Sequence, residues 1–243
     1  EVQKMSGLSP MMRHYLQIKD QYKDCVLFYR LGDFYEMFFD DAKEVSALLD
    51  LTLTGRDCGL EERAPMCGVP FHSYENYVAR LIAKGYKVAI CEQMEDPALA
   101  KGLVKRDIIR VVTPGTVIES SMLQDDKNNY IASIYITEKK AGVCFADVST
   151  GTAHATVLTG EKLGPEIISE LCRYSPSEVL FNPAILDYKD VTAYIKQQLT
   201  CAVELLEDSD FEPQACKARV EAQFSGEFCA AAGCEADGLQ ARA

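Results

Sequence analysis

A polar stretch without apolar periodicity, residues 117–128, divides the 243-residue chain into two segments. Before it, apolar strand-like runs are interleaved with amphipathic helix patterns, which indicates a mixed-sheet α/β domain over residues 1–116. After it, the order of the patterns changes, which indicates a second domain over residues 129–243. The sequence therefore predicts two α/β domains joined by a linker.

The second segment begins with three strand patterns, and helix and strand patterns then alternate. We expect strands at 129–137, 142–149, 151–158, 178–181 and around 203–206, and helices after Pro165, around 191–199 and around 213–224. The order βββαβαβα is typical of an RNase H-like domain. Residues 226–243 are rich in Ala, Gly and Cys and lack a capping signal, so we expect this domain to be truncated and its natural chain to continue.

The first segment contains clear helix starts and stops. Ser9 and Pro10 suit the N-cap and first position of a helix that continues to about Tyr22. Ser73 is placed to cap another helix, and Gly85 to end it. The remaining patterns predict strands at 25–31, 51–54, 86–92 and 108–112, a helix from Asp40 or Asp41 whose inner stripe includes Ala42, Val45, Leu48 and Leu49, and a charged loop at 55–65.

The net charge of −12 disfavours a protein that binds DNA through its overall charge. Residues 1–127 carry 16 basic and 20 acidic side chains, and residues 128–243 carry 9 and 17. A basic strip in the first segment is opposed only by Asp107 and consists of Lys101, Lys105, Arg106 and Arg110. Any contact with phosphate is therefore expected to be local, although such a strip is also typical of a solvated loop.

The ten cysteines never form a C-x-x-C pair, and several lie inside apolar strand-like runs. With only three histidines in the chain, a zinc site is poorly supported. We expect reduced thiols, no disulfide framework and no metal, as in a cytoplasmic protein. No apolar run approaches the roughly 18 residues of a membrane span, so no membrane contact is expected.

The segment from Phe28 to Phe39 holds six aromatic residues in twelve positions. Aromatic density alone favours a hydrophobic strand end. If the chain is extended after Gly32, however, Phe34 and Glu36 share one face of the strand. A phenyl ring beside a carboxylate is unusual in a core, because a buried charge needs a partner.

The same pair suits the reading of a DNA base. An apolar wedge inserted from the minor groove unstacks a base step and kinks the duplex. The cost is lowest where a base is already badly paired, and stacking on a phenyl ring returns roughly 1–3 kcal/mol. The neighbouring carboxyl group can form a hydrogen bond with a base edge. The pair therefore favours recognition of mispaired or unpaired bases.

These residues carry a resemblance to a known family. The stretch from Gly32 to Phe38 resembles the Phe-x-Glu motif of the MutS family of mismatch-repair proteins, and further stretches resemble that family's first domain in order. They are Ser9–Met12, Asp40–Lys43, Leu48–Thr54, Pro65–Pro70, Glu75–Tyr77, Val88–Gln93 and Arg110–Thr116. Residues 128–243 resemble, more loosely, the family's RNase H-like connector domain.

The resemblance implies that Phe34 stacks on the mispaired base and that Glu36 forms a hydrogen bond with it. It also implies further contacts to DNA. Met66 is expected to line the groove near the wedge. Contacts to the DNA backbone are expected from Arg56, His72, Asn76 and Arg110. Two of these have ordinary alternatives. His72 can satisfy a hydrogen bond ahead of the Ser73 cap, and Arg110 can pair with a carboxylate.

The resemblance further implies mismatched duplex DNA as the ligand and other mismatch-repair proteins as partners of the connector. The chain has no P-loop motif, so ATP and Mg²⁺ are expected only for a full-length protein with later domains. That protein is expected to be a homodimer in the cytoplasm, associated with the nucleoid. This chain alone is expected to be monomeric, without catalytic or metal-binding residues, and to bind DNA weakly and with poor selectivity.

Two alternatives remain. A metal-dependent nuclease would use Asp147 at a strand end, as RNase H-type enzymes place their first metal-binding acid, and its nearest acids on later strands are Glu178 and Glu204. The set of acids is thin, and an aspartate that shapes a turn is the better explanation of Asp147. A protein-docking module, by contrast, suits the acidic residues 128–243.

Overall fold

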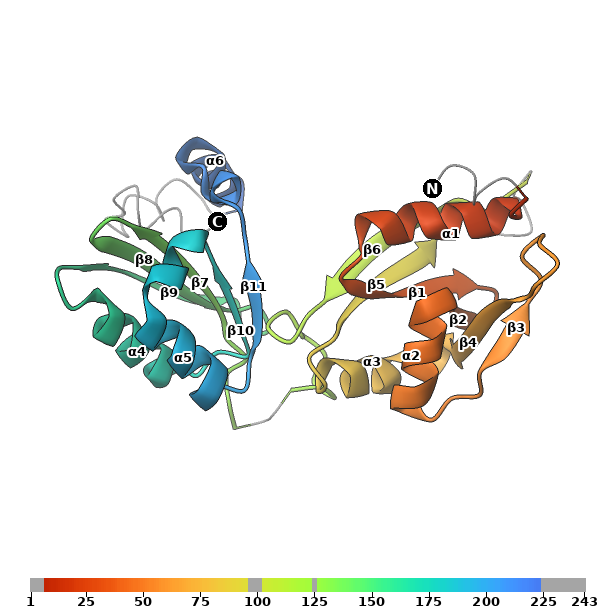
Figure 1. Ribbon diagram of the computed structural model, residues 1–243, viewed down its shortest axis with the longest axis horizontal. Coiled ribbons are helices and arrows are strands. Elements are labelled where there is room, and N and C mark those ends of the chain that lie inside the picture. The colour runs from red at the N-terminus through yellow and green to blue at the C-terminus, as the bar shows by residue number, and fades with distance from the viewer. Residues whose placement is uncertain (1–6, 96–101, 124–125, 224–243) are drawn as a thin grey trace. The chain divides into compact units, whose positions relative to one another are not determined.

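The computed structural model describes residues 7–95, 102–123 and 126–223. The chain forms two compact units, residues 1–113 and 114–243. Each unit has one β-sheet with helices packed on it, so the predicted α/β class is confirmed (Figure 1). The domain bounds drawn from the sequence, with a linker at 117–128, stay predictions.

The sheet of the first unit has the strand order β3-β4-β2-β1-β5-β6. Its strands are β1 (Cys25–Leu31), β2 (Phe34–Phe38), β3 (Thr54–Arg56), β4 (Ala64–Pro70), β5 (Lys87–Gln93) and β6 (Arg106–Val112). Its helices are α1 (Pro10–Gln21), α2 (Phe39–Leu49) and α3 (Tyr74–Ile82). Strands β1 and β5 pair in parallel, and the other neighbouring strands are antiparallel.

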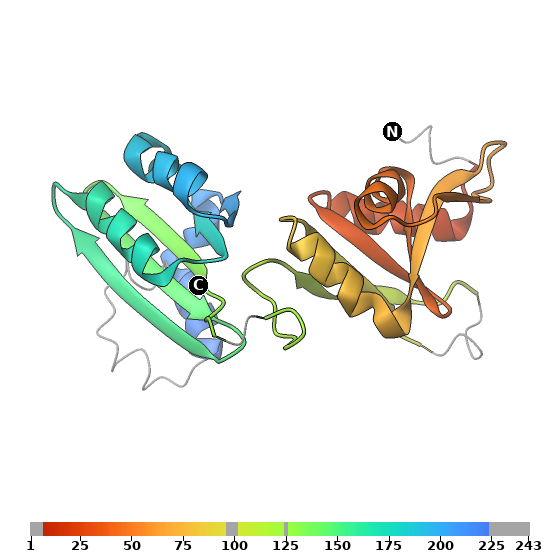
Figure 2. The ribbon, with the colours of Figure 1, turned by 90° about the horizontal axis from the view of Figure 1, so that it is seen from below.

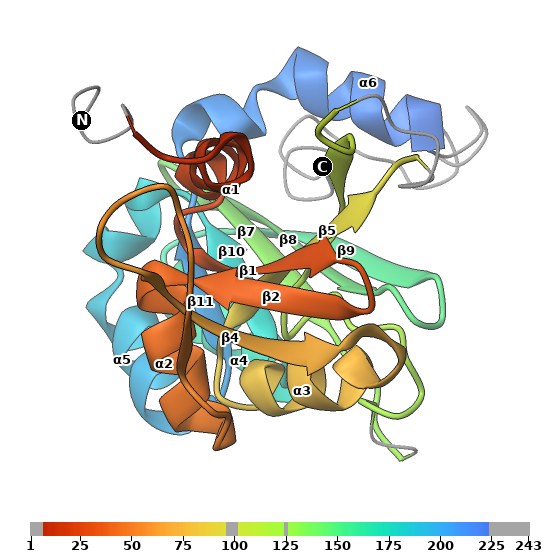
Figure 3. The same cartoon turned by 90° about the vertical axis from the view of Figure 1, so that its right-hand side faces the viewer.

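Helix α1 covers one face of this sheet, and α2 and α3 cover the other (Figures 1 and 3). Under α1, the buried side chains of Met12 and Tyr15 pack with Leu27, Tyr29 and Phe38 of the sheet. Because helices lie on both faces, β1 is buried on both sides. This burial accounts for the apolar run, interrupted only by Arg30, that predicted the strand.

The predicted helix ends are largely correct. The Ser9 hydroxyl accepts a hydrogen bond from the Met12 N–H at 3.4 Å, and Pro10 opens α1 as expected. Gly85 has a φ of 82°, the left-handed conformation expected after α3. Ser73 precedes α3, but its hydroxyl donates to the Pro70 carbonyl at 3.4 Å instead of capping the helix. In α2, Leu48 is half-buried instead of lying in the inner stripe.

The strand prediction was wrong between residues 51 and 70. Residues 51–53 form no strand, because the chain leaves α2 through Asp50 in the left-handed conformation before it reaches β3. The predicted loop at 55–65 contains most of β3 and the start of β4, and β4 itself was not predicted. This strand was missed because it contains Pro65 and Pro70, and proline is rare inside sheets.

The sheet of the second unit has the order β11-β10-β7-β8-β9. Its strands are β7 (Ile131–Thr137), β8 (Lys140–Asp147), β9 (Thr152–Thr159), β10 (Glu178–Phe181) and β11 (Ala202–Leu205), and its helices are α4 (Leu163–Tyr174), α5 (Lys189–Gln198) and α6 (Pro213–Gln223). Strands β7, β8 and β9 are antiparallel, whereas β10 is parallel to β7 and to β11. The predicted order βββαβαβα and its RNase H-like arrangement are confirmed.

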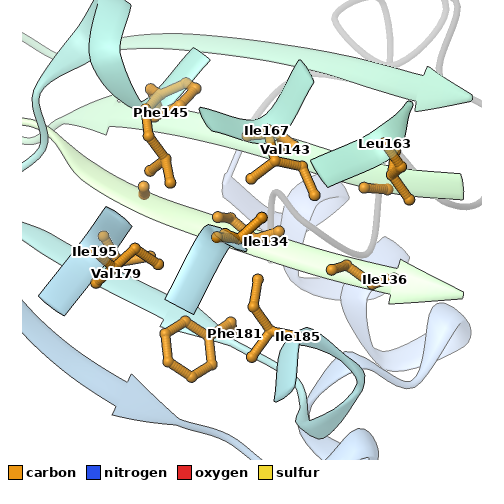
Figure 4. Packing of buried hydrophobic residues seen from close by; sticks show 14 residues of the cluster. Ile134, Ile136, Val143, Phe145, Leu163, Ile167, Val179, Phe181, Ile185 and Ile195 are labelled. Carbon is orange, nitrogen blue, oxygen red and sulfur yellow. The ribbon is translucent and has the colours of Figure 1, made fainter. Parts of the chain in front are cut away.

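The core of the second unit lies between its sheet and helices α4 and α5, which share one face of the sheet (Figure 2). Figure 4 shows Ile134 and Val143 of the sheet pointing toward Ile167 of α4, with Ile195 of α5 near Val179. The core is therefore mostly aliphatic, with Phe145 and Phe181 among its buried residues.

Residues just after the first unit pack into the second. The Gly115 N–H donates to a carboxylate oxygen of Glu178 at 2.9 Å, and the Asn129 side chain donates to the Pro114 carbonyl at 2.9 Å. A Cβ atom at Gly115 would lie 2.8 Å from the Cβ atoms of Glu178 and Ile131. Glycine is therefore required at this close approach.

The cysteines that the structure describes are all free thiols, as predicted, and most are buried. Cys229 and Cys234 lie outside the described residues. In the described parts of the chain, no helix has the length and apolar character that crossing a membrane would need.

Candidate nucleic-acid interface

The turn between β1 and β2 presents the predicted wedge residue. Gly32 has a φ of 56°, which a glycine adopts without strain, and the strands pair from Leu31 and Phe34 onward. Phe34 is 47% exposed, whereas Tyr35 and Met37 are buried. The predicted alternation of faces along β2 is confirmed. The interpretation of this segment as an ordinary hydrophobic strand end therefore holds for its neighbours but not for Phe34.

Glu36 shares the face of Phe34 and has a charged partner. Its carboxylate forms an ion pair with the Arg56 guanidinium at 2.5 Å, and the two side chains are 13% and 38% exposed. Gly68 lies directly opposite Glu36 on β4, where a Cβ atom would come within 3.4 Å of the Glu36 Cγ atom. The glycine thus leaves room for the Glu36 side chain.

One further candidate, Met66, lies on this face of the sheet. Met66 is in register with Phe38 and Thr54, and it is half-buried. Four strand positions separate it from Pro70, the partner of Phe34, which corresponds to about 13 Å along β4. Met66 is therefore on the correct face but distant from the wedge along the strand.

Arg110 lies on the other face of the sheet. It is in register with Ile90 of β5, which in turn is in register with Phe28 of β1, and residues in register share a face. Phe28 faces α2 and α3 together with Tyr35, whose ring lies 6.0 Å away. The structure therefore does not bring Arg110 together with Phe34 and Glu36.

His72 and Asn76 follow β4 in the chain. His72 lies in the short 3₁₀ turn Phe71–Ser73, with its ring edge-on to Phe71 at 5.9 Å, and Asn76 is in the first turn of α3. Both side chains are exposed.

The basic strip is only partly a surface feature. The Arg106 side chain is buried, donates to the carbonyls of Arg30 and Val104 at 2.8 Å, and lies 5.0 Å from the centre of the Tyr29 ring. Lys105 is exposed, and Lys101 lies outside the described residues.

Asp147, the residue on which the nuclease alternative depends, is buried and accepts hydrogen bonds from its own turn and from the segment before β7. One oxygen accepts from the Ser149 N–H at 2.9 Å and hydroxyl at 2.6 Å, and the other from the Asn128 side chain at 2.9 Å. Burial acts to raise the pKa of Asp147, but these hydrogen bonds outweigh it and lower that pKa. Among the described residues, no three His, Cys, Asp or Glu side chains are grouped to hold a metal ion.

Sequence reasoning missed three residues that shape this region: Arg30, Gly68 and Phe71. Arg30 interrupts an otherwise apolar strand, and a charge in a buried strand requires partners, so a signal was present. Gly68 and Phe71 belong to the unpredicted strand β4 and the turn after it. Their proximity to β2 follows from strand pairing and is not visible in local patterns.

Both units of the chain are similar to known proteins. The family model for MutS domain I matches residues 9–121, and that for MutS domain II matches residues 129–243. The DNA mismatch repair protein MutS of Acetivibrio thermocellus is 55% identical over 210 residues, and that of Ruminiclostridium cellulolyticum is 54% identical over 208. These alignments cover 86% of this chain and 24% of each relative, so the chain spans about a quarter of their length.

Proposed function

The chain belongs to the MutS family of DNA mismatch-repair proteins, and from this premise we propose that its first unit recognises mispaired or unpaired bases in duplex DNA as part of a longer protein. The observation that carries the proposal is the exposed Phe34 ring beside the Glu36–Arg56 ion pair. An exposed phenyl group at the end of a rigid sheet is suited to enter a base stack from the minor groove.

Phe34 acts as the wedge in this proposal. Insertion unstacks one base step, which costs a few kcal/mol and costs least where pairing is already defective. Stacking of the displaced base on the ring offsets the cost by roughly 1–3 kcal/mol. Selectivity then follows from the deformability of the DNA and not from its sequence.

Glu36 and Arg56 act beside the wedge. The Glu36 carboxyl group forms a hydrogen bond with the edge of the displaced base. An unpaired carboxylate near phosphates would be repelled, and Arg56 offsets this charge while remaining exposed enough to approach the DNA backbone. His72 and Asn76 are proposed as further backbone contacts because both are exposed.

The second unit is proposed to be the connector that contacts other mismatch-repair proteins. ATP and Mg²⁺ are assigned to other domains of a homodimeric full-length protein, located in the cytoplasm on the nucleoid. This chain by itself is expected to be monomeric and to bind DNA weakly.

The test compares mismatched and matched duplexes in the full-length protein. Phe34→Ala is expected to reduce the affinity for a duplex with one mispaired base about tenfold or more, because a stacking contact of roughly 1–3 kcal/mol is lost. Affinity for the matched duplex should change little. Fluorescence anisotropy at one fixed salt concentration measures both.

Leu53→Ala is the matched control, because Leu53 is an apolar residue of the same unit with 48% exposure. It should leave both affinities unchanged. If Phe34→Ala retained the wild-type preference for the mismatched duplex, the proposed function of this site would be wrong.

A further inference from the structure

Arg30 makes contacts on several sides of its guanidinium group, at the end of the sheet that bears Phe34. Its Nε atom donates to the Gly32 carbonyl at 2.5 Å, and Nη1 lies 3.3 Å from a carboxylate oxygen of Glu92. The flat face of the group stacks on the Phe71 ring, with 3.8 Å between the guanidinium carbon and the ring centre. Such a cation–π contact uses the planar shape of arginine, which lysine lacks.

Phe71 forms a second hydrogen bond with the same turn. Its backbone N–H donates to the Asp33 carbonyl at 2.9 Å. The carbonyls of Gly32 and Asp33, the two residues that connect β1 to β2, are therefore both bonded, one by the Arg30 side chain and one by the Phe71 backbone. Because Arg30 and Phe71 stack on each other, the two residues that form these hydrogen bonds are in direct contact.

A third contact ties this arrangement to the strand that carries the wedge. Arg30 is in register with Tyr35, the residue after Phe34, and the Tyr35 hydroxyl donates to Glu92 at 2.7 Å. Burial, followed by this hydrogen bond, raises the pKa of Tyr35, so the hydroxyl remains a donor. Arg30 and Tyr35 thus meet at one carboxylate on the face opposite Phe34.

We infer that Arg30 and Phe71 are positioning residues for Phe34, which fix the β1–β2 turn from the face opposite the wedge. This inference rests on the proposed function. Insertion of the ring into a base stack pushes back on the turn, and Gly32 gives that turn conformational freedom. A functional side chain must be held closely in place by its supporting contacts for its binding energy to be realised.

The experiment uses the full-length protein with two substitutions that weaken the contacts of Arg30 and Phe71 with the β1–β2 turn. Arg30→Lys keeps the charge near Glu92 but loses the flat stack and the Nε bond, and Phe71→Leu keeps the backbone bond but loses the ring. Phe71→Tyr restores the ring, and its added hydroxyl can point to solvent because Phe71 is 38% exposed. Arg80→Lys, at an exposed arginine of α3, is the matched control.

Two readouts separate positioning from folding. The first is the ratio of affinities for a duplex with one unpaired thymine and for the matched duplex. The second is the fluorescence of 2-aminopurine placed beside the unpaired base, which rises when the neighbouring stack opens. Arg30→Lys and Phe71→Leu are expected to lower the affinity ratio about fivefold and to reduce the fluorescence rise, while matched-duplex affinity and Tm stay near wild type. Phe71→Tyr should restore both readouts.

Two outcomes would overturn the inference without overturning the proposed function. In the first, Arg30→Lys and Phe71→Leu keep the wild-type ratio and fluorescence while Phe34→Ala loses them, which leaves the proposed function intact. In the second, both affinities fall together with Tm, which assigns Arg30 and Phe71 to stability alone. If Phe34→Ala itself keeps the ratio, the proposed function fails and the inference fails with it.

Discussion

The ion pair between Glu36 and Arg56 allows a test of how charge is arranged at the site. Arg56→Met is expected to weaken binding to matched and mismatched duplexes by about three- to tenfold, because a cation near the phosphates is lost and the Glu36 charge is left without its partner. In the double variant Glu36→Gln/Arg56→Met, the loss should be smaller than the sum of the two single losses. Anisotropy titrations of the four proteins at one ionic strength measure this coupling.

Arg80→Met is the control for the loss of one positive charge in the same unit, since Arg80 is an exposed residue with only a 3.9 Å contact to Asp50. It should show no coupling to Glu36→Gln. Strictly additive losses in the Glu36 and Arg56 variants would mean that the pair does not act as a unit when DNA is bound.

At the scale of single residues, the sequence predicts that a charged side chain needs a partner but does not identify that partner. The alternation of β2 showed that Glu36 would share a face with Phe34 and would need a compensating charge. It did not identify Arg56 as the partner of Glu36, because that ion pair depends on β3 and β4, neither of which was predicted correctly. Arg110 illustrates the opposite case. A basic residue in a predicted strand was a reasonable candidate, but strand register turns it to the other face of the sheet.

The strands differ in how clearly the sequence predicts them. Strand β1, buried on both sides, has an apolar run that only Arg30 interrupts, and β10 was predicted with the bounds that it has in the structure. Strand β4 has two prolines and a glycine, which local propensity assigns to a loop. It forms because β2 and β3 flank it and supply its pairing, which is a tertiary effect.

The turn between β8 and β9 depends on Asp147, and its stability should depend on pH. Since the pKa of Asp147 in the folded protein is below the ordinary value of about 3.9, its contribution is complete above that value and is lost as the pH falls through the folded pKa. Asp147→Asn is expected to lower the free energy of unfolding by about 1–2 kcal/mol at neutral pH, because the amide replaces one acceptor with a donor. The difference from wild type should shrink toward about pH 3.

Urea unfolding followed by circular dichroism, from about pH 6 to about pH 3, measures this difference. Asp187→Asn, at an exposed position of the same unit, serves as the control and should match the wild type throughout. A difference between wild type and Asp147→Asn that stays constant over this range would show that the Asp147 charge does not contribute.

On the scale of the whole chain, each unit has its own core, and buried thiols can report on each core separately. Buried cysteines of the first unit include Cys25, Cys67 and Cys91, and those of the second include Cys144 and Cys216. Burial raises the pKa of Cys25 and Cys91 to about 12 and that of Cys67 to about 11. Because the thiolate is the reactive form, these side chains should react only when their unit unfolds.

Asp41→Ala should destabilise the first unit selectively. The Asp41 carboxylate is buried and accepts from the Leu27 N–H at 3.0 Å and from the Tyr15 hydroxyl at 3.3 Å, and it pairs with Lys19 at 2.9 Å. Removal of the carboxylate leaves buried donors without an acceptor, so the free energy of unfolding should fall by roughly 2–4 kcal/mol. Asp40→Ala, one residue earlier and exposed, is the matched control.

Alkylation at increasing urea concentrations, read for each cysteine by peptide mass spectrometry, makes the test specific to each unit. In Asp41→Ala, Cys25 and Cys91 should become reactive at lower urea, whereas Cys144 and Cys216 should keep their wild-type midpoints. The exposed Cys172 should react without urea in every variant and so normalises the labelling. Equal shifts of the thiols in both units would mean that the chain unfolds as one cooperative block, because two cores that unfold independently cannot transmit a local loss of 2–4 kcal/mol to each other.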